Sequence, residues 1–329
     1  MLEINKFTSS LHRINESNFE DIALGLFQFQ YKNNLLYQTY VRHLGKDIAK
    51  VKSLHQIPFL PTRFFKSYPV VTGSWQPETQ FTSSATSGTE VSTHLVWNKQ
   101  FYLDNTTAVF QKFYGLLEGY HFLALLPSYI ERQGSSLIAM IDHFIKKDVS
   151  GNSGYYLNSH AELLLKIEAL KKSKKKTILW GVSFALLDLA EKFEVDLSHC
   201  MVMETGGMKG RRKEWVREEL HGFLCHRFNV KSIHSEYGMT ELFSQAYSAE
   251  RGYFQCPPWM KMMVRDLNDP LQLVGNGKMG AINVIDLANA HSCAFIETED
   301  LGRVGQDAYF EILGRADNSD IRGCNLLIT

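Results

Sequence analysis

The chain has 329 residues, of which 44% are hydrophobic and 21% are charged, as is typical of a globular protein with a large core. Lys+Arg and Asp+Glu are both 35, so the net charge is zero and no overall field favours nucleic acid or a membrane surface. The five cysteines are widely spaced and form no CxxC pair, which argues against a disulfide framework or a structural zinc site.

The same features indicate where the protein is found. The cysteine usage favours a reducing compartment. Residues 1–6 lack the apolar core of a signal peptide, and the longest uncharged apolar run, residues 177–187, is too short to span a bilayer. We therefore expect a cytoplasmic protein with no membrane span.

The expected elements form an α/β part followed by a β-rich part. Helical spacing predicts two amphipathic helices within residues 17–50. Further helices are expected at 99–117, 161–171, 184–193 and 213–223, and they alternate with strands expected at 121–126, 177–180, 197–204 and 230–234. This alternation predicts a largely parallel sheet up to about residue 245. Short strands expected at 262–265, 280–286, 294–298 and 309–313 predict the β-rich part.

The polar segment from Phe81 to Glu90 carries most of the chemical information. Ser and Thr compete for backbone hydrogen bonds, so this segment favours neither helix nor strand. Hydroxyls and free N–H groups can surround a polyanion, and Gly88 allows close approach. The chain lacks the GxxxxGK[ST] pattern, which argues against a P-loop NTPase. A plain surface loop is the alternative.

Three later segments carry polar residues at the ends of expected strands. Thr240 and Glu241 follow Tyr237 at the carboxyl edge of the expected sheet, where a hydroxyl can bind phosphate and a carboxylate can bind Mg²⁺. The alternative is a helix start with an acidic residue in its first turn. Segments 299–303 and 314–317 each follow an expected short strand, and their Asp and Arg residues can hold a ribose diol or a phosphate. Ordinary turns are the alternative.

In this order, the four segments resemble the adenylate-forming superfamily of acyl-CoA synthetases, luciferases and peptide-synthetase adenylation domains. Four stretches are similar, more narrowly, to the acyl-protein synthetases of the bacterial bioluminescence fatty-acid reductase complex: 58–66, 126–132, 204–210 and 322–326. Phenylacetate–CoA ligases are more distantly similar. The resemblance runs from about residue 55 to the end of the chain.

The resemblance implies an α/β fold of the adenylate-forming type, with mostly parallel sheets flanked by helices and a β-rich subdomain. The acyl-activating domain is expected at 1–313, with its α/β part reaching about residue 245 and its β-rich part at 260–313. A hinge motif and short tail would occupy 314–329. The family's small lid domain would begin where this sequence stops, so we expect that domain to be absent or truncated.

The resemblance also implies roles for individual residues. The residues that would cradle the ATP β- and γ-phosphates are Thr82, Ser83, Ser84, Thr86, Ser87, Gly88 and Thr89. The residues that would line the adenine are Gly206, Gly207 and Met208, with Tyr237 stacking on the base. Asp300 would bind the ribose hydroxyls, and Arg315 would lie near the ribose or phosphate.

Further implied roles concern the reaction itself. Thr240 would contact the α-phosphate and Glu241 would hold Mg²⁺. The phosphate loop has Ala85 where a Gly is usual and lacks the superfamily's Pro-Lys ending, so His94 is a candidate for the missing cation. A structural histidine is the alternative for that position.

The implied reaction joins a carboxylic, expectedly fatty, acid to ATP. The carboxylate attacks the α-phosphorus, pyrophosphate leaves, and acyl-AMP remains as the acyl donor. Cys324 stands where acyl-protein synthetases are thought to carry a thioester, and Arg322 can lower the pKa of its thiol. The expected onward acceptor is a partner reductase, a carrier protein or coenzyme A.

Three alternative functions remain open from the sequence. The first is an acyl-CoA ligase of the phenylacetate–CoA ligase type. The second is a serine acyltransferase or hydrolase with a nucleophile elbow at Ser183, although Ala185 replaces the final Gly of that pattern. The third is an inactive nucleotide-binding subunit. The apolar stretch 180–187 is a candidate lining for the acyl chain, with buried core as its alternative.

Overall fold

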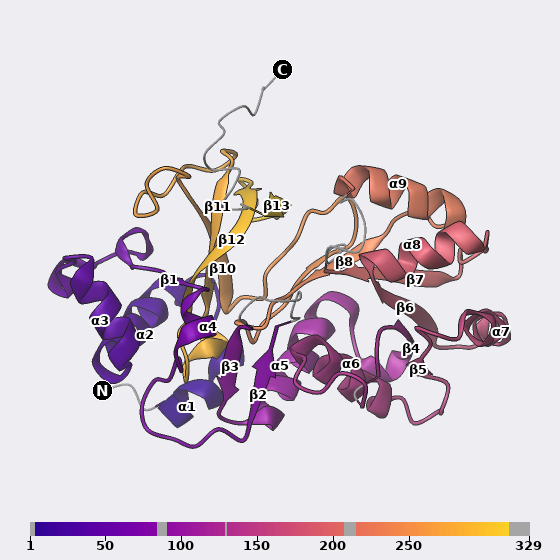
Figure 1. Cartoon of the computed structure of the whole chain (residues 1–329), viewed down its shortest axis with the longest axis horizontal. Helices are drawn as coiled ribbons and strands as arrows, with labels where there is room; N and C mark the ends of the chain where they lie inside the picture. The colour runs from indigo at the N-terminus through magenta and orange to yellow at the C-terminus, as the bar shows by residue number, and fades with distance from the viewer. Residues whose placement is uncertain (1–3, 84–90, 129, 207–214, 316–329) are drawn as a thin grey trace.

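Two main sheets and a small β-hairpin form the framework of the chain in the computed structural model, which describes residues 4–83, 91–128, 130–206 and 215–315 (Figure 1). The helices are α1 Ile4–Ser9, α2 Phe19–Asn33, α3 Leu35–His43, α4 Phe64–Ser67, α5 Lys99–Tyr114, α6 Ser136–Lys147, α7 His160–Leu170, α8 Ser183–Lys192 and α9 Arg217–Phe228. The strands are β1 Leu60–Pro61, β2 Thr79–Thr82, β3 Thr93–Val96, β4 Tyr120–Leu125, β5 Gly154–Tyr155, β6 Lys176–Val182, β7 Cys200–Thr205, β8 His234–Tyr237, β9 Ala246–Ser248, β10 Met260–Arg265, β11 Gly280–Asp286, β12 Phe295–Val304 and β13 Phe310–Arg315.

The six-stranded sheet has the order β5-β4-β6-β7-β8-β9 and is parallel except for β9. Its central strands are buried on both faces, as the apolar run of β4 predicts. Helices α8 and α9 cover one face, and α5 and α6 lie on the other (Figure 1). Because parallel strands end at the same edge, the residues after β6, β7 and β8 gather there.

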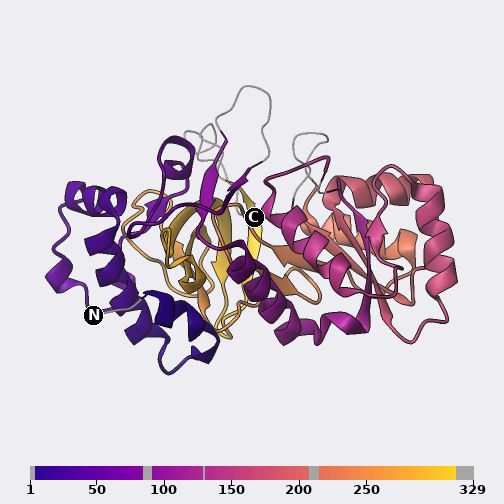
Figure 2. The ribbon, with the colours of Figure 1, turned by 90° about the horizontal axis from the view of Figure 1, so that it is seen from below.

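The second sheet has the order β1-β12-β11-β10, with β13 paired to β12. Its ladders are antiparallel except that β1 runs parallel to β12. The N-terminal helices lie beside this sheet (Figure 2). The buried Gln30 of α2 donates to the carbonyls of Asn289 and Ala290, at 3.0 Å each, and accepts from the Ala294 N–H. The N-terminal segment therefore packs onto the β-rich part.

The predicted α/β fold class is confirmed, but some element positions differ from the sequence prediction. Helix α9 ends five residues later than expected, at a left-handed Asn229 with φ of 50°. The strand expected at 230–234 consequently begins only at His234. Helix α6 was not expected, although Ser135 caps it by accepting from the Ile138 N–H. Within the described residues, no helix has the length and apolar character needed to cross a membrane.

A buried carboxylate holds the amino-terminal ends of β4 and β6 together. Asp148 accepts hydrogen bonds from Ser153 Oγ and Lys175 Nζ at 2.7 Å each, and His121 Nδ1 lies 2.9 Å away. Burial alone would raise the pKa of Asp148, but these partners hold it well below the ordinary range. A depressed native pKa stabilises the fold above the unfolded pKa of about 4, and this contribution is lost as the pH falls through the native pKa.

Asp148→Asn is therefore expected to lower the free energy of unfolding by about 2–4 kcal/mol at pH 7, because Lys175 and His121 lose their buried partner. Urea denaturation at pH 7 and pH 3 measures this, and the gap between wild type and variant should narrow at pH 3. The control is Asp142→Asn, whose carboxylate pairs with the exposed Lys146 and should change stability by less than about 1 kcal/mol. An equal loss in both variants would contradict the prediction.

Candidate functional site

Three candidate residues converge where the carboxyl end of β8 faces β12 and β13. Tyr237 is the last residue of β8, and its hydroxyl donates to Asp300 Oδ2 at 2.7 Å. Arg315, the last residue of β13, pairs with Asp300 across the ladder, and its Nε lies 3.6 Å from Asp300 Oδ1. Side chains from the two sheets thus meet at one point.

The segments carrying Asp300 and Arg315 were expected to follow short strands, and this expectation was wrong. Strand β12 continues through residues 295–304 and β13 includes Arg315. The chain stays extended because alternate side chains of β12 are buried. Burial raises the pKa of Asp300, while Tyr237 and Arg315 oppose that rise. The Arg315 side chain is 63% exposed, and its Nη2 also binds Glu299 Oε2 at 2.9 Å.

The ring of Tyr237 belongs to an aromatic cluster. It makes edge contacts with Phe310 and Phe254, at centroid distances of 5.6 and 6.0 Å. Those two rings stack on each other at 5.2 Å. Burial raises the pKa of Tyr237 well above its ordinary value, so the hydroxyl remains protonated and donates to Asp300. One side of the Tyr237 ring is therefore fixed by packing.

Gly206 directly follows β7, at the same edge of the sheet. Its φ of 63° lies in the left-handed region that favours glycine. Its carbonyl accepts from Ser183 Oγ at 2.5 Å, and this hydroxyl also binds the buried carboxylate of Glu204. Gly207 and Met208, the other residues expected to line adenine, lie outside the described residues.

The surroundings of Ser183 do not fit the alternative of a serine nucleophile. The side chain is buried at the start of α8, with 2% of its surface exposed. Its hydrogen-bond partners are the Glu204 carboxylate and the Gly206 carbonyl, and neither is the histidine with which the serine of a nucleophile elbow is paired. The surrounding stretch 180–187 is buried core throughout, which agrees with the simpler reading of that segment.

Two side chains near the start of β3 hold Thr240 and Glu241. His94 Nδ1 donates to the Thr240 carbonyl at 2.9 Å, and His94 Nε2 accepts from Ser292 Oγ at 2.8 Å. Ser92 lies two residues earlier, and its hydroxyl binds the Glu241 carboxylate. Strand β3 and the residue just before it, which follow the phosphate-loop segment, are thereby bonded to both residues of the Thr-Glu pair.

The environment of His94 does not fit its expected role as a cation. Both ring nitrogens are occupied, the side chain is fully buried, and burial lowers its pKa to about 4. The imidazole is therefore neutral at neutral pH. Its geometry instead suits a positioning residue that sets the backbone at Thr240.

His94→Ala is expected to lower the turnover of the acid-activating reaction that the sequence predicts by about 10–100-fold, because Thr240 loses its backbone partner. His94 should contribute no pH dependence to the wild-type rate between pH 6 and 8, since a group with a pKa of about 4 does not change its protonation there. The measurement is a pH–rate profile of wild type and variant, with His43→Ala on the exposed end of α3 as control. A wild-type rate that falls through a pKa near 6.5, and a variant without that fall, would restore the cation role.

Thr82 and Ser83 lie at the end of β2, beside these residues. The Ser83 N–H donates to the Ser92 carbonyl at 3.0 Å, and the Ser92 N–H donates to Ser83 Oγ at 3.0 Å. The Thr82 N–H donates to the Gly134 carbonyl at 2.7 Å. The remaining phosphate-loop candidates and the thiol candidate lie outside the described residues: Ser84, Thr86, Ser87, Gly88, Thr89 and Cys324.

A buried acid that was not predicted from the sequence, Asp286, fixes the backbone of the residues after Glu241. Asp286 ends β11, and its carboxylate accepts from the N–H groups of Phe243 and Ser244 at 2.8 Å each and from Ser244 Oγ at 2.7 Å. Nearby, Asn289 Nδ2 donates to the Glu241 carbonyl at 2.7 Å. The available signal was an Asp at the last position of an expected strand, followed three residues later by Asn.

The surroundings of Glu241 fit a single-carboxylate magnesium ligand. The Glu241 side chain is 6% exposed, and its burial raises its pKa. The nearby charge of Asp300 raises this pKa further, whereas Ser92 and Arg315 lower it. A cation stabilises the charged form of such a carboxylate. Mg²⁺ is commonly held by one or two carboxylates together with substrate phosphates. In the part of the chain that the structure describes, no three His, Cys, Asp or Glu side chains form a metal cluster.

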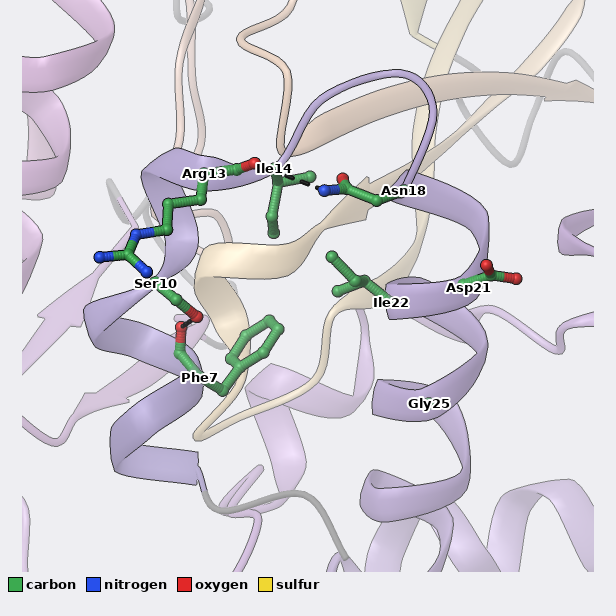
Figure 3. A pocket seen from close by; sticks show the side chains of 8 residues that line it. All are labelled: Phe7, Ser10, Arg13, Ile14, Asn18, Asp21, Ile22 and Gly25. Atoms are coloured by element: carbon green, nitrogen blue, oxygen red, sulfur yellow. Dashed lines mark hydrogen bonds between the residues drawn. The ribbon is translucent and has the colours of Figure 1, made fainter.

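A separate pocket lies at the N-terminal helices, away from these residues. Its volume is about 360 Å³, and Figure 3 shows its lining, which comes from α1, α2 and the segment between them. The lining residues are Phe7, Ser10, Arg13, Ile14, Asn18, Asp21, Ile22 and Gly25. None of the candidate nucleotide-binding residues described above lines this pocket.

Comparison with known families decides the identity. The profile described as acyl-protein synthetase, LuxE, matches residues 152–329, more than half of the chain. The chain belongs to this acyl-protein synthetase family. It is 23% identical over 342 residues to the long-chain-fatty-acid–luciferin-component ligase of Aliivibrio fischeri, with 91% of this chain and 85% of that protein covered. The predicted family and the predicted enzyme class, a ligase, are confirmed.

Solved structures confirm the adenylate-forming fold of this acyl-protein synthetase. An open conformation of 2-hydroxyisobutyryl-CoA ligase in complex with 2-HIB-AMP and CoA matches with a TM-score of 0.65 at 12% identity, covering 94% of this chain and 78% of that one. ATP-bound MatB from Rhodopseudomonas palustris matches with a TM-score of 0.53 at 16% identity and 72% coverage of this chain. The chain spans about half of the MatB structure, 47% of its length.

Proposed function

We propose that this acyl-protein synthetase activates a fatty acid with ATP, forming acyl-AMP at the carboxyl edge of β7 and β8. The observation that carries the proposal is the hydrogen bond from Tyr237 to Asp300, with Arg315 beside it. The resemblance assigns these three residues to one nucleotide, and they come from three strands of two sheets. Solved structures of similar fold support the chemistry, since one is bound to ATP and another is in complex with 2-HIB-AMP.

The nucleoside would be held by residues of both sheets. Tyr237 offers a ring fixed on one side by aromatic packing, and Asp300 offers a buried carboxylate for the ribose hydroxyls. Gly206 brings exposed backbone to the same edge without a side chain in the way. Thr82 and Ser83 begin the segment that would cradle the phosphates, and their hairpin is bonded to Ser92.

The chemical step is a displacement at the α-phosphorus. The substrate carboxylate forms a new O–P bond, the bond to pyrophosphate breaks, and acyl-AMP results. The protein's task is to position the reactants and to neutralise charge. Thr240 would contact the α-phosphate, with its backbone set by His94. Glu241 would hold Mg²⁺, which neutralises phosphate charge when bound.

The acyl group would then pass to a thiol. Attack by the Cys324 thiolate on the mixed anhydride forms a thioester and releases AMP. A partner reductase or carrier protein would be the onward acceptor. Direct transfer to coenzyme A is the second candidate, since the 2-hydroxyisobutyryl-CoA ligase structure contains CoA. The four described cysteines are free, which supports a cytoplasmic location.

Carboxylate-dependent exchange of labelled pyrophosphate into ATP tests the adenylation proposal. The panel should run from short to long fatty acids and include aryl acids, each with and without Mg²⁺. Exchange that needs a long-chain acid and Mg²⁺ is the expected result. Tight ATP binding without exchange by any acid would instead support the inactive nucleotide-binding alternative.

A further inference from the structure

A cationic side chain that the sequence analysis did not single out lies beside the proposed nucleotide site. Arg217 is the first residue of α9, and its Nη1 lies 3.8 Å from Glu204 Oε2. The positive charge of Arg217 acts on both Glu204 and Asp300, opposing in each case the rise in pKa that burial causes. The charge of Arg217 therefore acts on Glu204, two residues before Gly206, and on Asp300, the acid expected to bind ribose.

The guanidinium of Arg217 has an unused donor. Its Nη1 is buried and has no hydrogen-bond partner, since 3.8 Å from Glu204 exceeds a hydrogen-bond distance. Glu204 is already bonded to Ser183, and His221 Nε2 lies 3.9 Å away. Buried donors are normally paired, so an acceptor supplied by a ligand would complete this group.

The position of Arg217 is set by the same aromatic cluster that holds Tyr237. The guanidinium carbon lies 4.9 Å from the centroid of the Phe254 ring, which touches Tyr237. Gly252, with φ of 69°, also lies against this side chain, because a Cβ there would come within 2.7 Å of Arg217 Cδ. Gly252 thus leaves space for the arginine side chain, and the guanidinium lies over the Phe254 ring, next to the expected adenine position at Tyr237.

We propose that Arg217 binds the nucleotide, donating from its guanidinium to a phosphate oxygen of the adenylate. This inference rests on the proposed function and adds a cation to a site otherwise rich in carboxylates. Glu204, Asp300 and Glu241 are all buried, so an incoming phosphate needs a nearby positive charge. A guanidinium provides both the charge and a planar set of donors suited to phosphate.

The test compares a nucleotide with and without its phosphate. Calorimetry with AMP and with adenosine is run on wild type, Arg217→Ala, Arg217→Lys and the control Arg227→Ala. Arg227 lies on the same helix and binds Glu194 and the Ala190 carbonyl instead. We expect Arg217→Ala to weaken AMP binding by at least 10-fold and adenosine binding by less than 2-fold. Low millimolar guanidinium should restore much of the AMP affinity of Arg217→Ala. The AMP affinity of Arg217→Lys should lie between those of wild type and Arg217→Ala.

Each other outcome has a distinct meaning. Unchanged AMP affinity in a folded Arg217→Ala protein would overturn the inference and leave the proposed function standing. Equal weakening of AMP and adenosine would also overturn it, because Arg217 would then support the site without contacting phosphate. If Arg217→Ala does not fold, the same comparison is made with Arg217→Lys and Arg217→Gln. Wild-type protein that binds neither AMP nor ATP would refute the proposed function itself.

Discussion

Glu241→Gln is expected to reduce carboxylate-dependent ATP–pyrophosphate exchange by at least about 100-fold, because the only proposed protein ligand to Mg²⁺ would lose its charge. The variant should fold normally. The Gln carbonyl can still accept the hydrogen bond from Ser92, and a neutral amide is easier to bury than a carboxylate whose pKa burial has already raised. The loss should therefore reflect chemistry, with no change in the thermal midpoint.

Two comparisons sharpen this experiment. A magnesium titration should give an apparent affinity at least about 10-fold weaker in Glu241→Gln, since Mg²⁺ would then be held by substrate phosphates alone. Glu194→Gln, an exposed carboxylate paired with Arg227, should behave as wild type in both assays. Full exchange activity with an unchanged magnesium dependence in Glu241→Gln would remove Glu241 from the site.

The sequence predicted the buried strands well because their composition reflects burial. Strands β6 and β11 are mostly apolar, are buried along almost their whole length in the interior of their sheets, and lie where they were expected. Strand β1 could not be predicted in the same way. It has only two residues, and it pairs with Ile296 and Glu297 of β12, more than 200 residues later in the chain. Such pairing depends on the fold as a whole.

In the candidate site, too, some features could be predicted from the sequence and others depend on the fold as a whole. The family resemblance names Tyr237, Asp300 and Arg315 as nucleotide-binding candidates, and that role stays a prediction. Asp300 and Arg315 are partners in the ladder between β12 and β13, and Tyr237 of β8 donates to Asp300. The surroundings of His94 do not fit the candidate role as a cation, and they fit the alternative of a structural histidine. The pKa of His94 depends on burial by surrounding side chains, among them the rings of Phe65 and Phe243, which sequence spacing does not reveal.

Cys324→Ser is expected to abolish covalent labelling of the protein by a radioactive fatty acid while leaving pyrophosphate exchange within about 2-fold of wild type. The structure supports this by weakening the other candidates. Burial raises the pKa of all four described cysteines, to about 12 for Cys200 and Cys293. Thiols with raised pKa form little thiolate at neutral pH and react poorly with an acyl-AMP. Cys324 is the remaining cysteine of the five.

The control is Cys225→Ser, a half-buried thiol on α9, which should retain both labelling and exchange. Neutral hydroxylamine should release the label from wild type, because it cleaves thioesters faster than oxygen esters. A Cys324→Ser protein that is still labelled would place the thioester elsewhere. A protein that forms acyl-CoA equally well with and without Cys324 would favour coenzyme A as the acceptor. Because exchange is measured in the same samples, a failure of thioester formation is distinguished from a failure of adenylation.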